Sequence, residues 1–149
     1  MDNMQKYANY REQMGRLKKA LGHQFYLEAI FIEYAILEDR LESALLHSGK
    51  WTPAPDRHTS IDRKVRLLRK QAEEKKSLAR RYFTPELAES ILAWKERRNR
   101  LIHALMKQQL HTEDLQSVAE EGQTLIRMVS NKVGLFNRAI ERQKGTEKQ

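Results

Sequence analysis

Apolar residues recur at intervals of three and four along almost the whole chain, and this period constrains the fold more than any other feature. Such intervals return to the same side of an α-helix, whereas a half-buried β-strand needs strict alternation of apolar and polar residues. The helix formers Leu, Glu, Lys, Arg, Ala and Gln dominate the composition. We therefore expect an all-α fold without a sheet.

Residues that end or begin helices divide the first half of this pattern. One helix is expected over residues 3–20, ended by Gly22, and a second over residues 24–47. Residues 48–59 hold two of the three prolines and are expected to form a loop. Ser60 then offers a side-chain N-cap for a third helix that runs to about residue 81.

Two further helices are expected in the second half. Thr84 and Pro85 provide an N-cap and a first-turn proline for a fourth helix that runs to about residue 109. Thr112 repeats the start signal for a fifth helix to about residue 142, which leaves 143–149 as a frayed tail. The core-facing stripe expected on the fifth helix is Leu115, Val118, Gly122, Leu125, Val129, Val133, Phe136 and Ile140.

These helices have the length and short connections of an antiparallel bundle. Amphipathic helices joined in this way bury their apolar stripes best against one another. The 149 residues suit a single domain with one continuous core. We expect four main helices over residues 1–149, with the N-terminal helix as an extension or a dimer arm.

Composition narrows the classes of partner and chemistry. The chain has no cysteine, which excludes disulfides, thiolate metal sites and a cysteine nucleophile, and its histidines lack metal-ligand spacing. We expect no metal and no cofactor. A net charge of +8 favours an anionic partner. With no run of about 20 apolar residues and no leader pattern, we expect a soluble cytoplasmic protein that does not enter a membrane.

Charged residues interrupt two of the apolar stripes, Glu38 in the second helix and Arg98 in the fourth. A charge at a core-facing position is costly unless it is paired and hydrogen-bonded, so we expect Glu38 and Arg98 to meet between the helices. A purely structural salt bridge that fixes the helix register is the alternative. The other members of the two stripes are Leu27, Phe31, Tyr34, Leu41 and Leu45, and Leu87, Ile91, Trp94, Leu101 and Leu105.

Arg98, Asn99 and His103 form a motif on the fourth helix that suits phosphate chemistry. Arginine offers a planar fork of donors to phosphate oxygens, and histidine exchanges protons near neutral pH. Asn99 lies four residues before His103, on the same helical face, where its amide can orient the imidazole or a phosphate. Three other arginines precede a histidine at similar distances but lack the polar residue that follows Arg98: Arg16, Arg40 and Arg97.

This Arg98–His103 motif resembles the signature of the HEPN superfamily of small helical bundles. The resemblance implies a metal-independent endoribonuclease in which the ribose 2′-hydroxyl attacks the adjacent phosphate, giving a 2′,3′-cyclic phosphate. It implies His103 as the general acid or base and Arg98 as the group that stabilises charge on the phosphoryl oxygens, with Asn99 in support. Leu105 stands where the toxin branch of the superfamily usually carries a tyrosine.

One chain alone does not bring the motif together. On an ideal helix Arg98 and His103 lie about 140° apart, and Arg100, three residues before His103, is the nearer cation. Members of the superfamily usually join two motifs across a symmetric dimer, so we expect a homodimer with a composite cleft. The resemblance further implies RNA as substrate, a role in defence or stress response, and a regulatory protein or antitoxin as a further candidate partner.

The third helix carries a run of basic residues along which an RNA backbone could lie. A solvated basic face is the alternative interpretation, and Tyr82 and Phe83 are the nearest rings for stacking on bases. For the whole protein, the alternatives to an enzyme are a non-catalytic HEPN-like module that binds nucleic acid, nucleotides or protein, and a purely structural bundle. The expected RNA contacts are Arg63, Arg66, Arg69, Lys70, Arg80 and Arg81.

Overall fold

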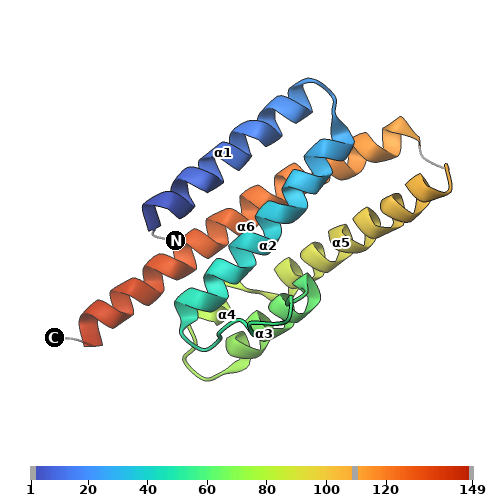
Figure 1. The fold of residues 1–149 in the computed structure, drawn as a ribbon. Coiled ribbons are helices and arrows are strands. Elements are labelled where there is room, and N and C mark those ends of the chain that lie inside the picture. The colour runs from blue at the N-terminus through green and yellow to red at the C-terminus, as the bar shows by residue number, and fades with distance from the viewer. Residues whose placement is uncertain (1–2, 109–110, 148–149) are drawn as a thin grey trace. The chain divides into compact units, whose positions relative to one another are not determined.

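A computed structural model describes residues 3–108 and 111–147, and the regular secondary structure of this part of the chain is α-helix alone, without a strand (Figure 1). The expected all-α class is confirmed. None of the described helices has both the length and the apolar character that crossing a membrane requires. The helices are α1 (Asn3–Gly22), α2 (Tyr26–Ser48), α3 (Ile61–Glu73), α4 (Ala79–Tyr82), α5 (Pro85–Met106) and α6 (Thr112–Glu147).

The helices divide into two compact units, and α2, α5 and α6 contribute to both. The first unit takes the chain up to Ile36 together with Ala93–Ile126. The second takes Leu37–Leu92 and the chain from Arg127 onward. The single domain and the antiparallel bundle stay predictions, as does fraying at the end of α6, which continues to Glu147 rather than ending near residue 142.

In the first unit, α1 ends in a hydrogen-bonded turn from which the first part of α2, up to Ile36, runs back alongside it (Figure 1). The backbone N–H of Phe25 donates to the carbonyl of Ala20 at 2.8 Å, and that of Gln24 to Leu21 at 3.1 Å. This pair of bonds is the Schellman motif, in which a residue just after the end of the helix takes the left-handed conformation. Gln24 takes that conformation, with φ 61°. Gly22, which was expected to end the helix, is its last residue, and the left-handed residue follows two positions later at Gln24.

The buried side of α2 differs from the expected stripe. Leu41 and Leu45 are buried as expected, but Phe31 is 49% exposed and Glu33 is fully buried. The core therefore lies on the side of α2 that carries Ile30 and Leu37, three residues before and four residues after Glu33. The buried apolar residues of α2 are Ala29, Ile30, Ile36, Leu37, Leu41, Ala44 and Leu45.

The later helices follow their expected stripes more closely. In α5, Leu87, Ile91, Trp94 and Leu101 are buried, whereas Leu105 in the last turn is 39% exposed. The stripe of α6 is buried from Val118 to Phe136, with Leu115 and Ile140 half-buried at its ends. Both caps are confirmed, because the Ser60 Oγ accepts from Arg63 N and the Thr84 Oγ1 from Leu87 N, each at 3.2 Å.

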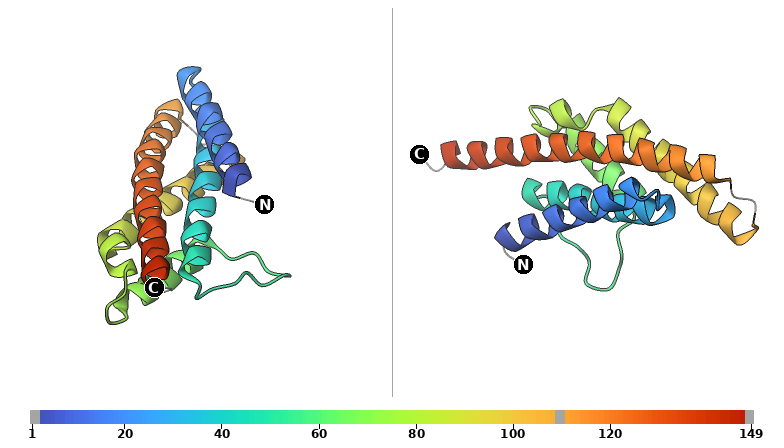
Figure 2. Two further views of the ribbon diagram at one scale, coloured as in Figure 1. Left: turned by 90° about the vertical axis from the view of Figure 1, so that its left-hand side faces the viewer. Right: turned by 90° about the horizontal axis from the view of Figure 1, so that it is seen from above.

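The expected third helix is broken in two, because α3 ends at Glu73 and α4 begins at Ala79. The guanidinium of Arg80 donates to the carbonyl of Ala72 at 3.0 Å and to those of Glu73 and Glu74 at 3.2 Å. A helix leaves its last carbonyls without partners, and one side chain satisfies several of them here. In both views of Figure 2, the loop before α3 projects away from that helix.

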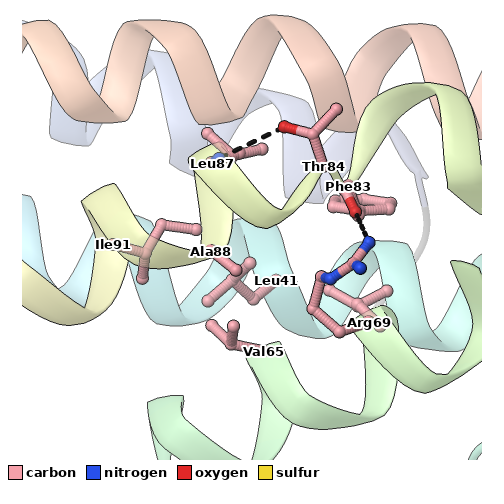
Figure 3. A pocket seen from close by; sticks show the side chains of 9 residues that line it. Leu41, Val65, Arg69, Phe83, Thr84, Leu87, Ala88 and Ile91 are labelled. Atoms are coloured by element: carbon pink, nitrogen blue, oxygen red, sulfur yellow. Dashed lines mark hydrogen bonds between the residues drawn. The ribbon is translucent and has the colours of Figure 1, made fainter.

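A small apolar cavity lies in the second unit between α2, α3 and the start of α5 (Figure 3). Leu41, Val65 and Ile91 are among its walls, and its free volume of about 10 Å³ holds no more than one water. At its edge the Arg69 Nη1 donates to the Phe83 carbonyl at 2.6 Å. The cavity is too small for a ligand and belongs to the packing of the core.

Replacing Arg80 tests the cap on α3. We expect Arg80→Ala to lower the free energy of unfolding by about 1–3 kcal/mol, because carbonyls that Arg80 satisfies lose a charged donor. Arg81→Ala is the matched control, since the contact of Arg81 within the described residues is with the Tyr82 ring at 5.8 Å, and the loss of stability should stay near 0.5 kcal/mol. Urea denaturation measures both, and equal losses would contradict the cap.

Candidate functional site

The Arg98–His103 motif lies in the part of α5 that belongs to the first unit. The Arg98 Nη1 donates to the amide oxygen of Asn99 at 3.1 Å. The Arg98 Cζ lies 4.0 Å from the ring centroid of Tyr34 and 5.6 Å from that of Phe31, both on α2. A guanidinium over an aromatic face is attracted by the negative charge of the ring face. Arg98 is thereby held against α2, half-buried, with its planar fork in a defined position.

The histidine of the motif lies apart from this arrangement. His103 is exposed, as is Arg100, and the Asn99 amide oxygen is engaged by Arg98. In the described part of the chain no hydrogen bond or ion pair joins His103 to the other motif residues. The fold thus brings Arg98 and Asn99 together and leaves His103 toward solvent, as expected from their angular separation on a helix.

Glu38, the acid expected to pair with Arg98, has partners in its own unit. Its Oε2 lies 3.1 Å from the Nε2 of His58 and 3.9 Å from the Nζ of Lys64, which is almost fully buried. Arg98 belongs to the other unit, and its pairing with Glu38 stays a prediction. Each charge has neighbours in its own unit, and the Arg98 Nε is buried without a hydrogen-bond partner among the described residues.

The acid in the core of the first unit is Glu33. Its side chain is fully buried, and neither carboxyl oxygen has a hydrogen-bond partner among the described residues. A Cβ placed on Gly122 of α6 would lie 2.6 Å from the Glu33 Cδ and 2.8 Å from the Trp94 Cζ2, so the carboxyl and the indole lie directly over this glycine. Burial raises the pKa of Glu33 from 4.5 to about 9, and the group is protonated at neutral pH.

The sequence-based prediction missed Glu33 because it assigned Phe31 and Tyr34 to the buried stripe of α2. The signal was present in the flanking residues, since Ile30 and Leu37 share a helical face with Glu33. A second signal was Gly122 within the α6 stripe, where a glycine in a helix interior costs stability unless something approaches the backbone closely.

Polar contacts tie α5 to α6 beside Glu33. The Trp94 Nε1 donates to the carbonyl of Val118 at 3.0 Å, one turn before Gly122. Arg97 forms an ion pair with Glu121 and donates to the Ser117 Oγ at 3.3 Å. The motif of α5 therefore rests on a helix whose preceding turn is fixed to α6 by an indole and a guanidinium.

The basic residues expected to contact RNA separate into two groups. Arg69 and Arg80 donate to backbone carbonyls and hold the fold together. Arg63, Arg66 and Lys70 are exposed and lie three and four positions apart, on one face of α3. Arg81 is exposed as well and overlies a neighbouring ring.

The rings expected to stack on bases near α3 do not serve that purpose. Tyr82 and Phe83 are both buried and pack edge-on against Phe136, with ring centroids 6.2 Å and 5.1 Å apart. The expectation is wrong because these residues close the core of the second unit. Among the described residues, no group of three or more His, Asp or Glu side chains is arranged to hold a metal ion.

No protein-family model matches the chain, and comparison with curated proteins and with solved structures found no match. The resemblance to the HEPN superfamily therefore depends on Arg98, Asn99 and His103 and on the helical class of the fold.

The buried carboxyl predicts a dependence of stability on pH. An unfolded chain releases the Glu33 proton near pH 4.5, whereas the folded chain retains it up to about pH 9. Between these values the Glu33 contribution to the free energy of unfolding should fall by about 1.4 kcal/mol per pH unit as the pH rises.

Glu33→Gln removes this ionisation, so its stability advantage over the parent should grow from pH 5 to pH 9. Urea denaturation at pH 5, 7 and 9 measures the difference. Glu89→Gln, at an exposed position of α5, is the control and should run parallel to the parent. If the free energy of unfolding of Glu33→Gln changed with pH in parallel with that of the parent, the buried neutral carboxyl would be contradicted.

The close approach at Gly122 gives a second stability prediction. Gly122→Ala should lower the free energy of unfolding by about 1–3 kcal/mol, because the new methyl overlaps Glu33 and Trp94. Gly134→Ala, in the same helix, is the control. Its Cβ would meet nothing nearer than the Arg138 Nη1 at 3.5 Å, so it should gain up to about 1 kcal/mol from helix propensity. Equal effects at both sites would refute the steric account.

Proposed function

We propose that the protein is a metal-independent endoribonuclease of the HEPN type that works as a homodimer. The observation that carries the proposal is the division of the motif: Arg98 is held on the Tyr34 ring while His103 is exposed on the same helix. A phosphate-binding group in a fixed position and a nearby solvent-facing proton donor are what half of a composite site would present. A twofold axis beside this part of α5 would supply the other half.

The chemistry needs proton transfer at two oxygens. The 2′-oxygen attacks phosphorus and loses its proton to a base, while the bond from phosphorus to the 5′-oxygen breaks and that oxygen takes a proton from an acid. Two copies of His103 facing one cleft supply the base and the acid. Arg98, with Arg100 as the exposed neighbouring cation, stabilises the charge that grows on the phosphoryl oxygens.

Exposed charge on α3 supports RNA as the substrate. Arg63, Arg66 and Lys70 present three cations along one helical face to solvent. Contacts of this kind bind the phosphate backbone without reading its sequence, and their strength falls with salt. The expected cleavage is therefore of broad sequence preference.

A non-catalytic RNA-binding module is the second candidate. It is favoured by the engagement of Arg98 with Asn99 and the aromatic rings of α2, which would suit a purely structural arginine equally well. In that case the cations of α3 bind RNA and the motif only fixes α5 against α2.

Cleavage in the presence of a chelator separates the two candidates. Mixed RNA incubated with the protein and excess chelator should give fragments that end in 2′,3′-cyclic phosphates. His103→Ala should slow this cleavage by about 100-fold or more, because general acid–base catalysis contributes that much. His111→Ala, which removes another exposed histidine, should leave the rate unchanged. RNA binding without cleavage, or equal rates for His103→Ala and the parent, would exclude the enzyme.

The composite site makes a separate prediction about assembly. Sedimentation velocity at micromolar concentration should show a dimer, and the cleavage rate per chain should fall when dilution dissociates it. A monomer that cleaves at an undiminished rate per chain would contradict the shared cleft.

A further inference from the structure

A hollow of about 320 Å³ lies in the first unit at the turn between α1 and α2. No residue of the Arg98–His103 motif lines it. Its volume falls at the lower end of the range for small-molecule sites, which begins near 300 Å³. The lining residues are Arg16, Lys19, Ala20, His23, Phe25 and Glu28.

The turn that ends α1 builds an aromatic platform at this hollow. The left-handed Gln24 and the hydrogen bond from Phe25 N to Ala20 O fix the residues on either side of the turn. As a result the rings of His23 and Phe25 stack, with centroids 5.6 Å apart and planes 25° from parallel. Phe25 is 57% exposed, which is unusual for a large apolar ring and leaves much of the ring open to a planar ligand.

Two cations lie on the α1 side of the same hollow. Arg16 and Lys19 are three residues apart and share a helical face. Arg16 pairs with Glu12 at 3.3 Å, but both side chains are more than half exposed, and pairs of this kind contribute little stability. A phosphate can therefore compete for the guanidinium at small cost. Glu28, in the first turn of α2, is the acidic group of the lining.

We propose that this hollow binds one nucleotide. The base stacks on the exposed Phe25 ring, which stacks in turn on His23, and the phosphate contacts Arg16 and Lys19. Glu28 accepts a hydrogen bond from an exocyclic amino group or a ribose hydroxyl. Aromatic platforms beside cations bind single-stranded nucleic acid in a way that tolerates any base. A free nucleotide and one residue of a single strand share this chemistry. The site is independent of the proposed cleavage reaction.

The test uses a probe that the proposed reaction cannot cut. A fluorescein-labelled RNA octanucleotide with 2′-O-methyl riboses lacks the attacking hydroxyl, so binding is measured whether or not the protein is a ribonuclease. Fluorescence anisotropy gives the dissociation constant at several salt concentrations. Titration with AMP, followed by NMR, is the second arm. If AMP displaces the probe and shifts the NMR signals of Phe25, the ligand of the hollow is a free nucleotide. If the octanucleotide binds and AMP does not, the ligand is a single strand.

Matched variants localise the binding. Phe25→Ala should weaken binding by about tenfold, because stacking contributes about 1–3 kcal/mol per base, and Phe25→Trp should restore it. Tyr7→Ala removes another exposed ring of the first unit, 63% exposed on α1, and should have no effect. Thermal melts followed by circular dichroism confirm that each variant is folded.

The two cations of the hollow, Arg16 and Lys19, have their own control. The double variant Arg16→Ala with Lys19→Ala should make binding less dependent on salt. The slope of the logarithm of the binding constant against the logarithm of the salt concentration should fall by the share of about two contacts between cation and phosphate. Arg11→Ala with Lys18→Ala removes the same charge from exposed positions of α1 that do not line the hollow. Equal losses from the two double variants, or equal binding by Phe25→Ala and the parent, would overturn the proposal, as would the absence of binding by both probes.

Discussion

The first unit depends on one contact, in which the buried carboxyl of Glu33 lies over Gly122 beside the Trp94 indole. A carboxyl without partners is costly to bury, and the cost is lowest when the group is neutral. The glycine allows α6 to approach, and the indole then reaches the Val118 carbonyl. The next turn of α5 carries Arg98, so the position of the motif depends on a neutral acid that plays no part in the proposed chemistry.

Much of the fold could be predicted from the sequence. The stripe of α6 and the caps at Ser60 and Thr84 are local patterns, and local patterns survive packing. The break after α3 could not be predicted, because the side chain that stabilises it, Arg80, acts on carbonyls six to eight residues away. The left-handed residue after α1 could not be predicted either. Gly22, two residues earlier, was the stronger signal in the sequence, but the hydrogen bonds of the turn place Gln24 in the left-handed conformation.

The sequence suggested the residues of the candidate site but not their surroundings. Helix geometry was enough to separate Arg98 from His103. Among the described residues of its own unit, Arg98 contacts the Asn99 amide and two aromatic rings of α2 rather than a carboxylate. The apolar pattern of α2 gave no means of telling which of its faces carries Tyr34 toward α5. The same ambiguity placed Glu38 in the core instead of Glu33. A helix with apolar residues around more than half its circumference offers two faces that could be buried, and the packing of neighbouring helices decides which one is.

The neutral state of Glu33 means that folding of this chain binds a proton. Near pH 7 the unfolded chain carries an ionised carboxylate at this position, and the folded chain carries the acid. Hydronium thus behaves as a ligand of the native state, with the Gly122 and Trp94 surface as its binding pocket. Each folding event near neutrality withdraws one proton from the buffer at Glu33, and each unfolding event returns it.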